Sequence, residues 1–276
     1  MGGGTVTAQE QALLRALQAT FPVLDQWRDL LCKPFVPVDS SDLAVDDQDW
    51  RWLQPGQLAW AGLSSARDHL HAVRVHIEAR ELFPVAQSTL IRAGLVGGAT
   101  TVWLLAPSGR HERLRRSRVL LAETYRRHDQ FNTKALELPT DQLLPGATPF
   151  AAHIRNRLGE VQAKRDADGQ RGGFVQTDVI HEAALVVFPH NPAAVTEIDL
   201  IWQSTSGAAH GLTWSLFGQP DSTLVSEPDE SGMAWFAVAG GLQRIANSYL
   251  GVFQLALRGW QLLAARSGIP YPVTSL

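Results

Sequence analysis

The chain has 276 residues, a formal net charge of −3 and a hydrophobic fraction of 45%. These values are typical of a globular protein with a full core, and they exclude a disordered chain. The small net charge provides no overall attraction to nucleic acid, which argues against a dedicated non-specific DNA-binding protein. The single cysteine, Cys32, excludes a disulfide framework and a cysteine-rich metal site.

Neither the start of the chain nor its apolar runs indicate secretion or a membrane. Residues 1–10 lack the basic start and apolar core of a signal peptide. The longest apolar run, from Ala93 to Ala106, is shorter than the ~20 residues that a bilayer-spanning helix needs. We therefore expect a cytoplasmic protein with no membrane partner.

The first part of the chain predicts one short helix, an irregular segment and two long helices. Residues 8–19 carry leucines at three- and four-residue spacing, which predicts a helix. Several prolines, beginning with Pro22, predict that residues 21–46 are irregular and wrap the surface. Apolar periodicity predicts a helix at 57–83, and the almost wholly apolar stretch 85–105 predicts a second helix that is central and buried.

Three glycines interrupt the apolar helix predicted at 85–105. Gly94, Gly97 and Gly98 each cost about 1 kcal/mol relative to alanine in a helix interior. Close approach of a neighbouring helix would compensate for this cost. The sequence therefore predicts that the backbone of another helix packs against this one.

The rest of the chain predicts more helices and one small β-element. Helical periodicity recurs at about 112–136, 150–166, 178–188, 193–217 and 242–267. Two short β-prone runs around a turn predict a β-hairpin near residues 222–239. The predicted fold class is mainly α, with a helical bundle at 57–276 and an N-terminal helix and wrapping segment at 1–56. Both parts are expected to form one structural domain.

A polar stripe between residues 199 and 214 is the first candidate site. If one helix runs through it, five side chains at three- and four-residue steps share a face. They are Asp199, Gln203, Ser206, His210 and Trp214. Small residues beside the stripe would leave a groove, in which His210 is a candidate general base and Ser206 its partner or nucleophile. The alternative is a histidine that Ser206 or Gln203 holds in a packed interface.

Three charged side chains on otherwise apolar helix faces are the second candidate site. Asp68, Arg92 and Arg118 are each predicted to point inward. Buried charges are unfavourable unless they pair or line a wet cavity. Either Asp68 pairs with Arg92 or Arg118, or the two guanidinium groups bind an anion such as phosphate or carboxylate.

Two other charged clusters are interpreted as helix starts. The arginines between residues 110 and 118 fan around a helix, which favours a solvated helix start over a nucleic-acid patch. Asp46, Asp47 and Asp49 favour an acidic helix start over a metal site. The chain contains no zincin or di-iron motif, no phosphate loop and no serine elbow, so we expect no metal and no cofactor.

Several of these segments together resemble known helical proteins. The segments are Asp68-His69-Leu70, Ser88 to Ala93, Trp103 to Leu105, Arg113 with Arg116, and Ser206 to Gly211. Their order and spacing resemble a group of uncharacterised helical proteins from high-GC bacteria. The last segment, Ser-Gly-Ala-Ala-His-Gly, also resembles the HEPN (higher eukaryotes and prokaryotes nucleotide-binding) domains. In that family an arginine four to six residues before a histidine makes an RNase site, usually at a dimer interface.

The resemblance implies RNA cleavage or a role in defence or toxin systems, and a homodimer. Here no arginine lies four to seven positions before His210, and position 203 is glutamine. Glutamine lacks the fixed positive charge that stabilises a cyclising phosphate. The leading hypothesis is therefore a HEPN-like bundle, degenerate as a nuclease, that binds a nucleotide, RNA or a protein partner through a polar groove. The groove residues would be Asp68, Arg92, Arg118, Asp199, Gln203, Ser206, His210 and Trp214.

Two alternatives to this hypothesis remain open from the residues alone. One is an enzyme that acts on a small anionic substrate with His210 as general base. The other is a non-enzymatic, oligomeric regulatory protein whose groove is filled by a second subunit. Whether the protein is an enzyme is not decided by the sequence.

Overall fold

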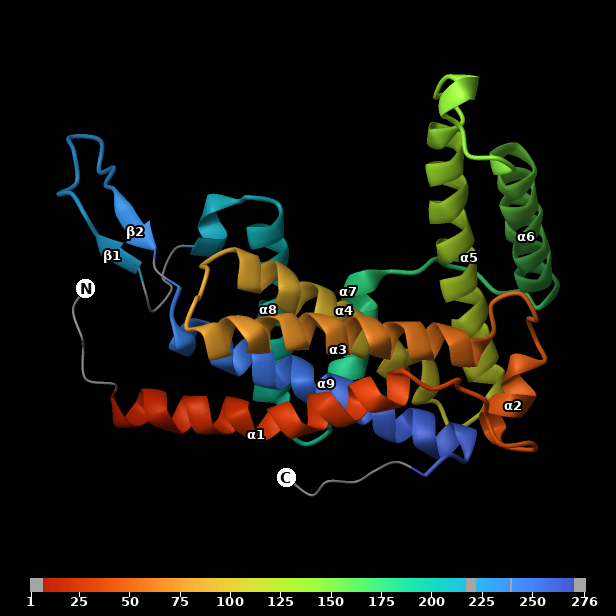
Figure 1. Ribbon diagram of the computed structural model, residues 1–276, viewed down its shortest axis with the longest axis horizontal. Helices are drawn as coiled ribbons and strands as arrows, with labels where there is room; N and C mark the ends of the chain where they lie inside the picture. The colour runs from red at the N-terminus through yellow and green to blue at the C-terminus, as the bar shows by residue number, and fades with distance from the viewer. Residues whose placement is uncertain (1–6, 217–221, 239, 271–276) are drawn as a thin grey trace.

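The computed structural model describes residues 7–216, 222–238 and 240–270 (Figure 1). The helices are α1 (Ala8–Leu31), α2 (Asp42–Asp47), α3 (Pro55–Ala79), α4 (Ala86–Leu105), α5 (Arg110–Ala135), α6 (Ala147–Ala167), α7 (Gln176–Val187), α8 (Pro192–Ala209) and α9 (Leu242–Ser267). Single-turn helices lie at Thr140–Gln142 and Thr213–Leu216. The predicted fold class, a mainly α protein with a small β-hairpin, is confirmed.

The β-hairpin consists of β1 (Ser222–Leu224) and β2 (Phe236–Val238), which pair antiparallel with Thr223 opposite Ala237. It lies where the sequence predicts it, although residue 239 is outside the described residues. Figure 1 shows a body of long helices and two arms that project from one side of the body, near its opposite ends. We call residues 222–238 the β-arm, and the outer part of the α5–α6 hairpin, residues 126–157, the α-arm.

The apolar helix α4 forms the centre of the body and packs mainly on α3 and α9. A Cβ added at Gly97 would overlap the carbonyl oxygen of Gly62 in α3, and one at Gly98 would lie 3.1 Å from the Ala256 nitrogen in α9. The predicted close approach of neighbouring helices at the α4 glycines is therefore confirmed. These contacts are possible only because the glycines have no side chain.

Among the helices of the described residues, α4 alone is long and apolar enough to cross a bilayer. It has 20 residues, in agreement with the helix predicted at 85–105, and the apolar run at 93–106 is only part of it. Within the structure 61% of its apolar window is buried inside the protein, so α4 forms part of the helical core. The cytoplasmic location stays a prediction.

The first helix is longer than the sequence predicts, because Pro22 lies inside α1 and does not end it. Beyond Pro22, α1 contributes the fully buried Leu24 and Trp27 to the core, and Trp27 stacks on Phe253 and Trp260 of α9. A proline inside a helix costs about 3 kcal/mol, and burial of a large apolar side chain returns roughly 1.5–3 kcal/mol. Two such side chains offset the proline, so the irregular segment predicted at 21–46 is confined to the residues between α1 and α2.

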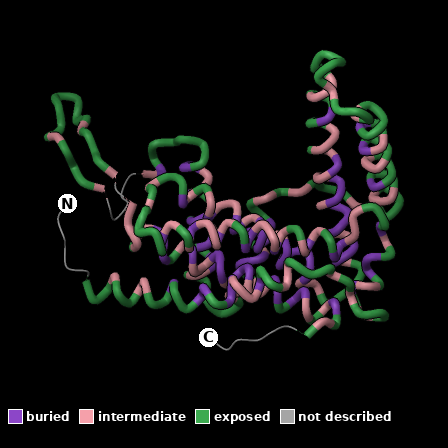
Figure 2. The backbone as a smooth tube through the Cα atoms, in the orientation of Figure 1, coloured by how far each residue is buried: buried purple, intermediate pink, exposed green. Residues whose placement is uncertain are grey.

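The core continues from the body into the base of the α5–α6 hairpin. There Trp50, Tyr125 and Val161 belong to a second apolar cluster, and Trp50 Nε1 donates a hydrogen bond of 3.1 Å to the Tyr125 hydroxyl. Figure 2 shows the buried backbone concentrated in the body, whereas both arms are largely exposed. Both arms therefore present most of their surface to solvent.

Candidate functional site

The helix that carries the predicted polar stripe ends earlier than its sequence pattern indicates. α8 stops one residue before His210, and Gly211 adopts a φ of +69°. The Gly211 amide donates to the Ala208 carbonyl at 3.1 Å, and the Leu212 amide donates to the Gly207 carbonyl at 2.9 Å. This pair of hydrogen bonds is the Schellman motif, which needs a left-handed residue. The predicted continuation of the helix to residue 217 was wrong, because Gly211 ends it.

Loss of helical continuity removes His210 and Trp214 from the stripe. The His210 side chain is exposed at the end of α8. Trp214 folds back, so that a Cβ on Gly207 would lie 2.6 Å from its ring. The partner that the structure gives Ser206 is Arg92, whose Nε donates a 3.1 Å hydrogen bond to the Ser206 hydroxyl, and not the predicted His210.

Arg92 joins α4 to α8. Besides the hydrogen bond to Ser206, its guanidinium lies over the Trp202 ring at 4.8 Å from the ring centroid. Both contacts hold the half-buried arginine inside the protein, where it is paired with a neutral hydroxyl and an aromatic face. The predicted ion pair between Arg92 and Asp68 therefore does not form.

Asp68 points outward and not inward, which corrects the prediction from the α3 pattern. Its side chain is 78% exposed and pairs with the neighbouring Arg67 at 3.2 Å. Arg67 is the residue that turns into the protein, and its Nε donates to the Leu24 carbonyl. The apolar face of α3 is therefore centred one position away from the face that the sequence pattern assigned to Asp68.

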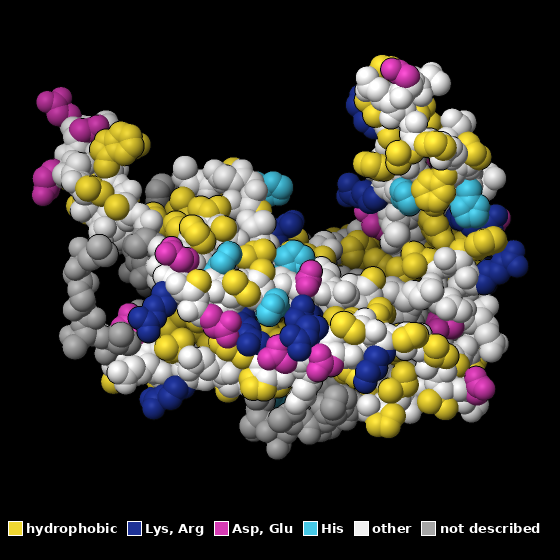
Figure 3. Space-filling model, viewed as in Figure 1, with side chains coloured by type: hydrophobic (Ala, Val, Ile, Leu, Met, Phe, Trp, Pro, Cys, Tyr) yellow, Lys and Arg dark blue, Asp and Glu magenta, His cyan; other side chains and the backbone are white. Residues whose placement is uncertain are grey.

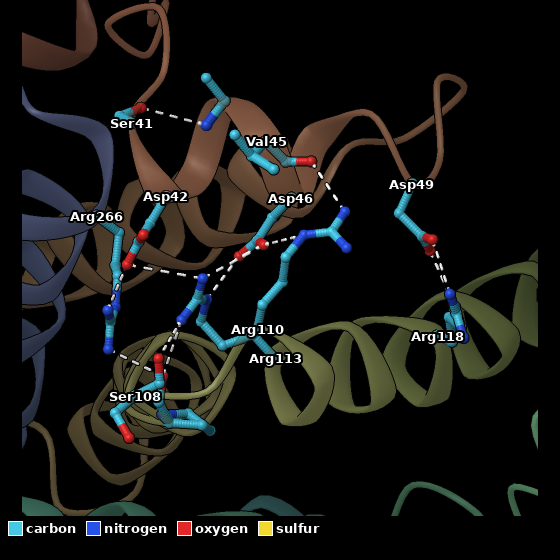
Figure 4. A network of polar contacts seen from close by, with 12 residues as sticks. Ser41, Asp42, Val45, Asp46, Asp49, Ser108, Arg110, Arg113, Arg118 and Arg266 are labelled. Atoms are coloured by element: carbon cyan, nitrogen blue, oxygen red, sulfur yellow. Dashed lines mark hydrogen bonds and ion pairs between the residues drawn. The ribbon is translucent and has the colours of Figure 1, made fainter.

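Arg118 belongs to a buried ion network that joins α5 to the segment around α2 (Figure 4). Its Nε and Nη2 donate to the Asp49 carboxylate at 2.9 and 2.7 Å, and it also pairs with Asp168. Burial raises the pKa of Asp49, but hydrogen bonds from Arg118 and Lys164 outweigh burial and leave this pKa below its ordinary value. Arg118 is therefore paired with Asp49 and Asp168 and does not share a site with Arg92.

A neighbouring set of ion pairs between α5 and α2 contains Arg113, whose Nε donates to Asp46 at 2.6 Å (Figure 4). The Arg113 and Asp46 side chains are only 4% and 2% exposed. The predicted solvated start of α5 fails at Arg113, although the Arg110 and Arg115 side chains are 49% and 37% exposed. The predicted acidic helix start was wrong in position, because Asp46 and Asp47 lie at the end of α2. The two clusters neutralise each other across 67 residues of sequence, which a local pattern does not show.

A polar pocket of about 390 Å³ lies between α7 and α8. Its lining residues are Thr177, Asp178, His181, Glu182, Asp199, Trp202 and Gln203. The pocket thus includes two residues of the predicted stripe, Asp199 and Gln203, and combines them with a face of α7. It is the place where the described residues bring the predicted α8 side chains together with a histidine.

That histidine is His181, which the sequence did not single out. His181 Nδ1 lies 2.9 Å from Asp199 Oδ2, and both side chains are partly exposed to the pocket. In a neutral His181 that donates from Nδ1 to the carboxylate, Nε2 keeps its lone pair. A histidine held in this way by a carboxylate is oriented to accept a proton or a hydrogen bond.

The pocket is negatively charged. Asp178 and Glu182 add two carboxylates to that of Asp199. Glu182 is partly neutralised by Arg116 Nη2 at 2.9 Å and accepts from Trp103 Nε1 at 3.1 Å. Asp178 lies exposed in the first turn of α7. Carboxylates outnumber cationic groups, so the pocket attracts positive charge and disfavours the anionic ligands that the sequence suggested.

The sequence gives a weak indication of the α7 residues that line the pocket. Asp178, His181 and Glu182 are spaced by three and four residues, so that they share one face of a helix. The spacing alone does not identify Asp199 as a partner, because that residue lies 18 positions further along the chain. Across the described ranges no group of three or more His, Cys, Asp or Glu side chains has the arrangement of a metal site.

Comparison of the chain with protein-family models, with curated proteins and with solved structures gives no match. The geometry of the α7–α8 pocket and the Ser-Gly-Ala-Ala-His-Gly motif are therefore the observations on which a function can be proposed.

Proposed function

We propose that the protein binds a small, positively charged organic molecule, such as an amine or guanidine, in the α7–α8 pocket. The observation that carries the proposal is the hydrogen bond between His181 Nδ1 and Asp199 inside a pocket lined by carboxylates. Asp178 and Glu182 pair with the positive charge of the ligand. His181 Nε2 accepts a hydrogen bond from a ligand N–H or O–H.

Size and charge both support this class of ligand. The cavity of about 390 Å³ falls within the range of roughly 300–1,000 Å³ that is typical of small-molecule sites. A phosphate placed about 4 Å from one of the carboxylates would meet a repulsion of roughly 1–4 kcal/mol per unit charge pair. The same Coulomb energy favours a cation by a similar amount, so the negative charge of the pocket selects a cationic ligand.

The HEPN-like hypothesis stays a prediction and concerns a different place. Its support is the motif itself and the exposure of His210 at the end of α8. The missing positive charge would have to come from another helix, but Arg92 is bound to Ser206 and Arg118 to Asp49. A degenerate nuclease that binds RNA or a nucleotide would therefore use His210 and not the α7–α8 pocket.

Ligand binding by matched histidine variants separates the two hypotheses. Thermal shift and calorimetry would be recorded with spermidine, arginine and choline, and with AMP and a short RNA. We expect the cations to stabilise the protein and His181→Ala to weaken their binding about tenfold, since a lost hydrogen bond of about 1 kcal/mol adds to the lost orientation of Asp199. His210→Ala is the matched control and should bind the cations as the wild type does.

Two results would decide against the pocket. The first is that none of the three cations stabilises the wild-type protein. The second is equal affinity of the wild type and His181→Ala for the cation that does bind. Binding of AMP or RNA that disappears in His210→Ala would instead support the HEPN-like hypothesis.

A further inference from the structure

The α-arm carries an apolar pocket of about 550 Å³ near its outer end. The apolar side chains in its lining include Phe131, Leu136, Leu138, Leu143, Leu144 and Phe150. Leu144 is 80% exposed, and Phe131 and Phe150 are also exposed. An apolar cavity of about 150 Å³ already holds a benzene ring, so this pocket has room for an indole.

The β-arm presents an exposed tryptophan that could fill such a pocket. Trp235 is 79% exposed and lies beside the exposed Met233 and Val225. The turn is held in place by Asp229, whose Oδ1 accepts from the amides of Ser231 and Met233 at 2.9 Å each. An exposed tryptophan on a projecting hairpin is typical of an interface anchor, because tryptophans are enriched in binding hot spots.

The two arms also differ in charge. The β-arm contains three carboxylates and no arginine or lysine. Residues 126–157 of the α-arm contain five arginines and lysines against three carboxylates. In the space-filling view the β-arm shows hydrophobic and acidic side chains, and the α-arm shows hydrophobic side chains with basic ones beside them (Figure 3). Opposite charge around two apolar surfaces favours contact between a β-arm and an α-arm.

Contact within one chain is excluded by the distance between the arms, which stand near opposite ends of the body (Figure 1). Both arms project from the same side. A two-fold axis perpendicular to the view of Figure 1 therefore brings the β-arm of each copy to the α-arm of the other. Such an arrangement closes on itself and contains the same contact twice.

We propose that this protein forms a two-fold dimer in which Trp235 of each copy enters the α-arm pocket of the other. The dimer covers the exposed apolar side chains of both arms, and contiguous exposed apolar patches mark interaction sites. The α7–α8 pocket belongs to neither arm, so the proposal is independent of the ligand proposed above.

Light scattering coupled to size-exclusion chromatography of the full chain tests the dimer. We expect twice the chain mass of 30.2 kDa for the wild type. Trp235→Ala and Leu144→Arg should each raise the dimer dissociation constant at least about 30-fold, the loss typical of a central anchor. Leu200→Ala, at an exposed leucine on α8 outside both arms, is the matched control and should remain dimeric.

A mixture of the two arm variants gives a sharper test of the two-fold arrangement. A heterodimer of Trp235→Ala with Leu144→Arg keeps one intact contact, so mixing should restore part of the dimer. Circular dichroism establishes that each variant is folded. A monomeric wild type, a dimer that survives both substitutions, or a series of masses beyond the dimer would each overturn the proposal.

Discussion

Replacement of Asp47 by asparagine should change the pH dependence of stability by a predictable amount. Asp47 is only 6% exposed, and its Oδ1 accepts a 2.7 Å hydrogen bond from the Gly56 amide in the first turn of α3. Burial raises the pKa of Asp47 from 3.8 to about 6; the hydrogen bond from Gly56 lowers it, and the charge of Asp46 raises it further. Between about pH 4 and pH 6, Asp47 therefore keeps its proton in the folded chain, whereas in the unfolded chain it has already lost it.

The sign of the effect follows from this raised pKa. The stabilising contribution of the Asp47 proton is complete below about pH 4 and is lost as the pH rises through about 6. A difference of about 2 units corresponds to about 3 kcal/mol. Asparagine keeps the acceptor for Gly56 and does not ionise. Relative to the wild type, Asp47→Asn should thus gain up to about 3 kcal/mol of stability between pH 4 and pH 8.

Urea unfolding of both proteins across this pH range measures the difference directly. The difference between the two free energies of unfolding cancels the titration of the other acids, which both proteins share. Asp68→Asn is the matched control for the loss of one carboxylate, because the Asp68 side chain is 78% exposed and lies outside the Asp47 site. A wild-type minus variant difference that is constant from pH 4 to pH 8 would refute the assignment to Asp47.

Two further predictions concern the packing of the body. Gly97→Ala should destabilise the fold by several kcal/mol in chemical denaturation, because its Cβ would overlap the backbone of Gly62 and both helices would have to separate. Gly159→Ala is the matched change in α6, where nothing lies within 4 Å, and it should stabilise by up to about 1 kcal/mol; equal effects would contradict the proposed close approach. Arg113→Ala should cost about 3–5 kcal/mol, since it leaves Asp46 largely buried without its closest partner. A loss below about 1 kcal/mol in urea unfolding would show that solvent reaches Asp46.

The sequence by itself determined the helical architecture, because periodicity and turn chemistry act between near neighbours in the chain. The predicted bounds of α9 agree with the structure, and α4 begins within one residue of its predicted start. The glycines of α4 correctly predicted close helix packing, since a glycine in a helix interior has an intrinsic cost that something must offset. Even the end of α8 had a local indicator, Gly211, whose missing side chain permits the left-handed turn.

Only the tertiary structure decided which polar groups meet. His181 with Asp199, Arg92 with Ser206, and Arg118 with Asp49 are separated by 18, 114 and 69 residues, respectively. Charged side chains take whichever partner the packing of helices brings within reach, and a pattern of spacing along one helix does not contain that information. For the same reason α1 runs through Pro22, because apolar burial against α9 outweighs a local preference to end the helix.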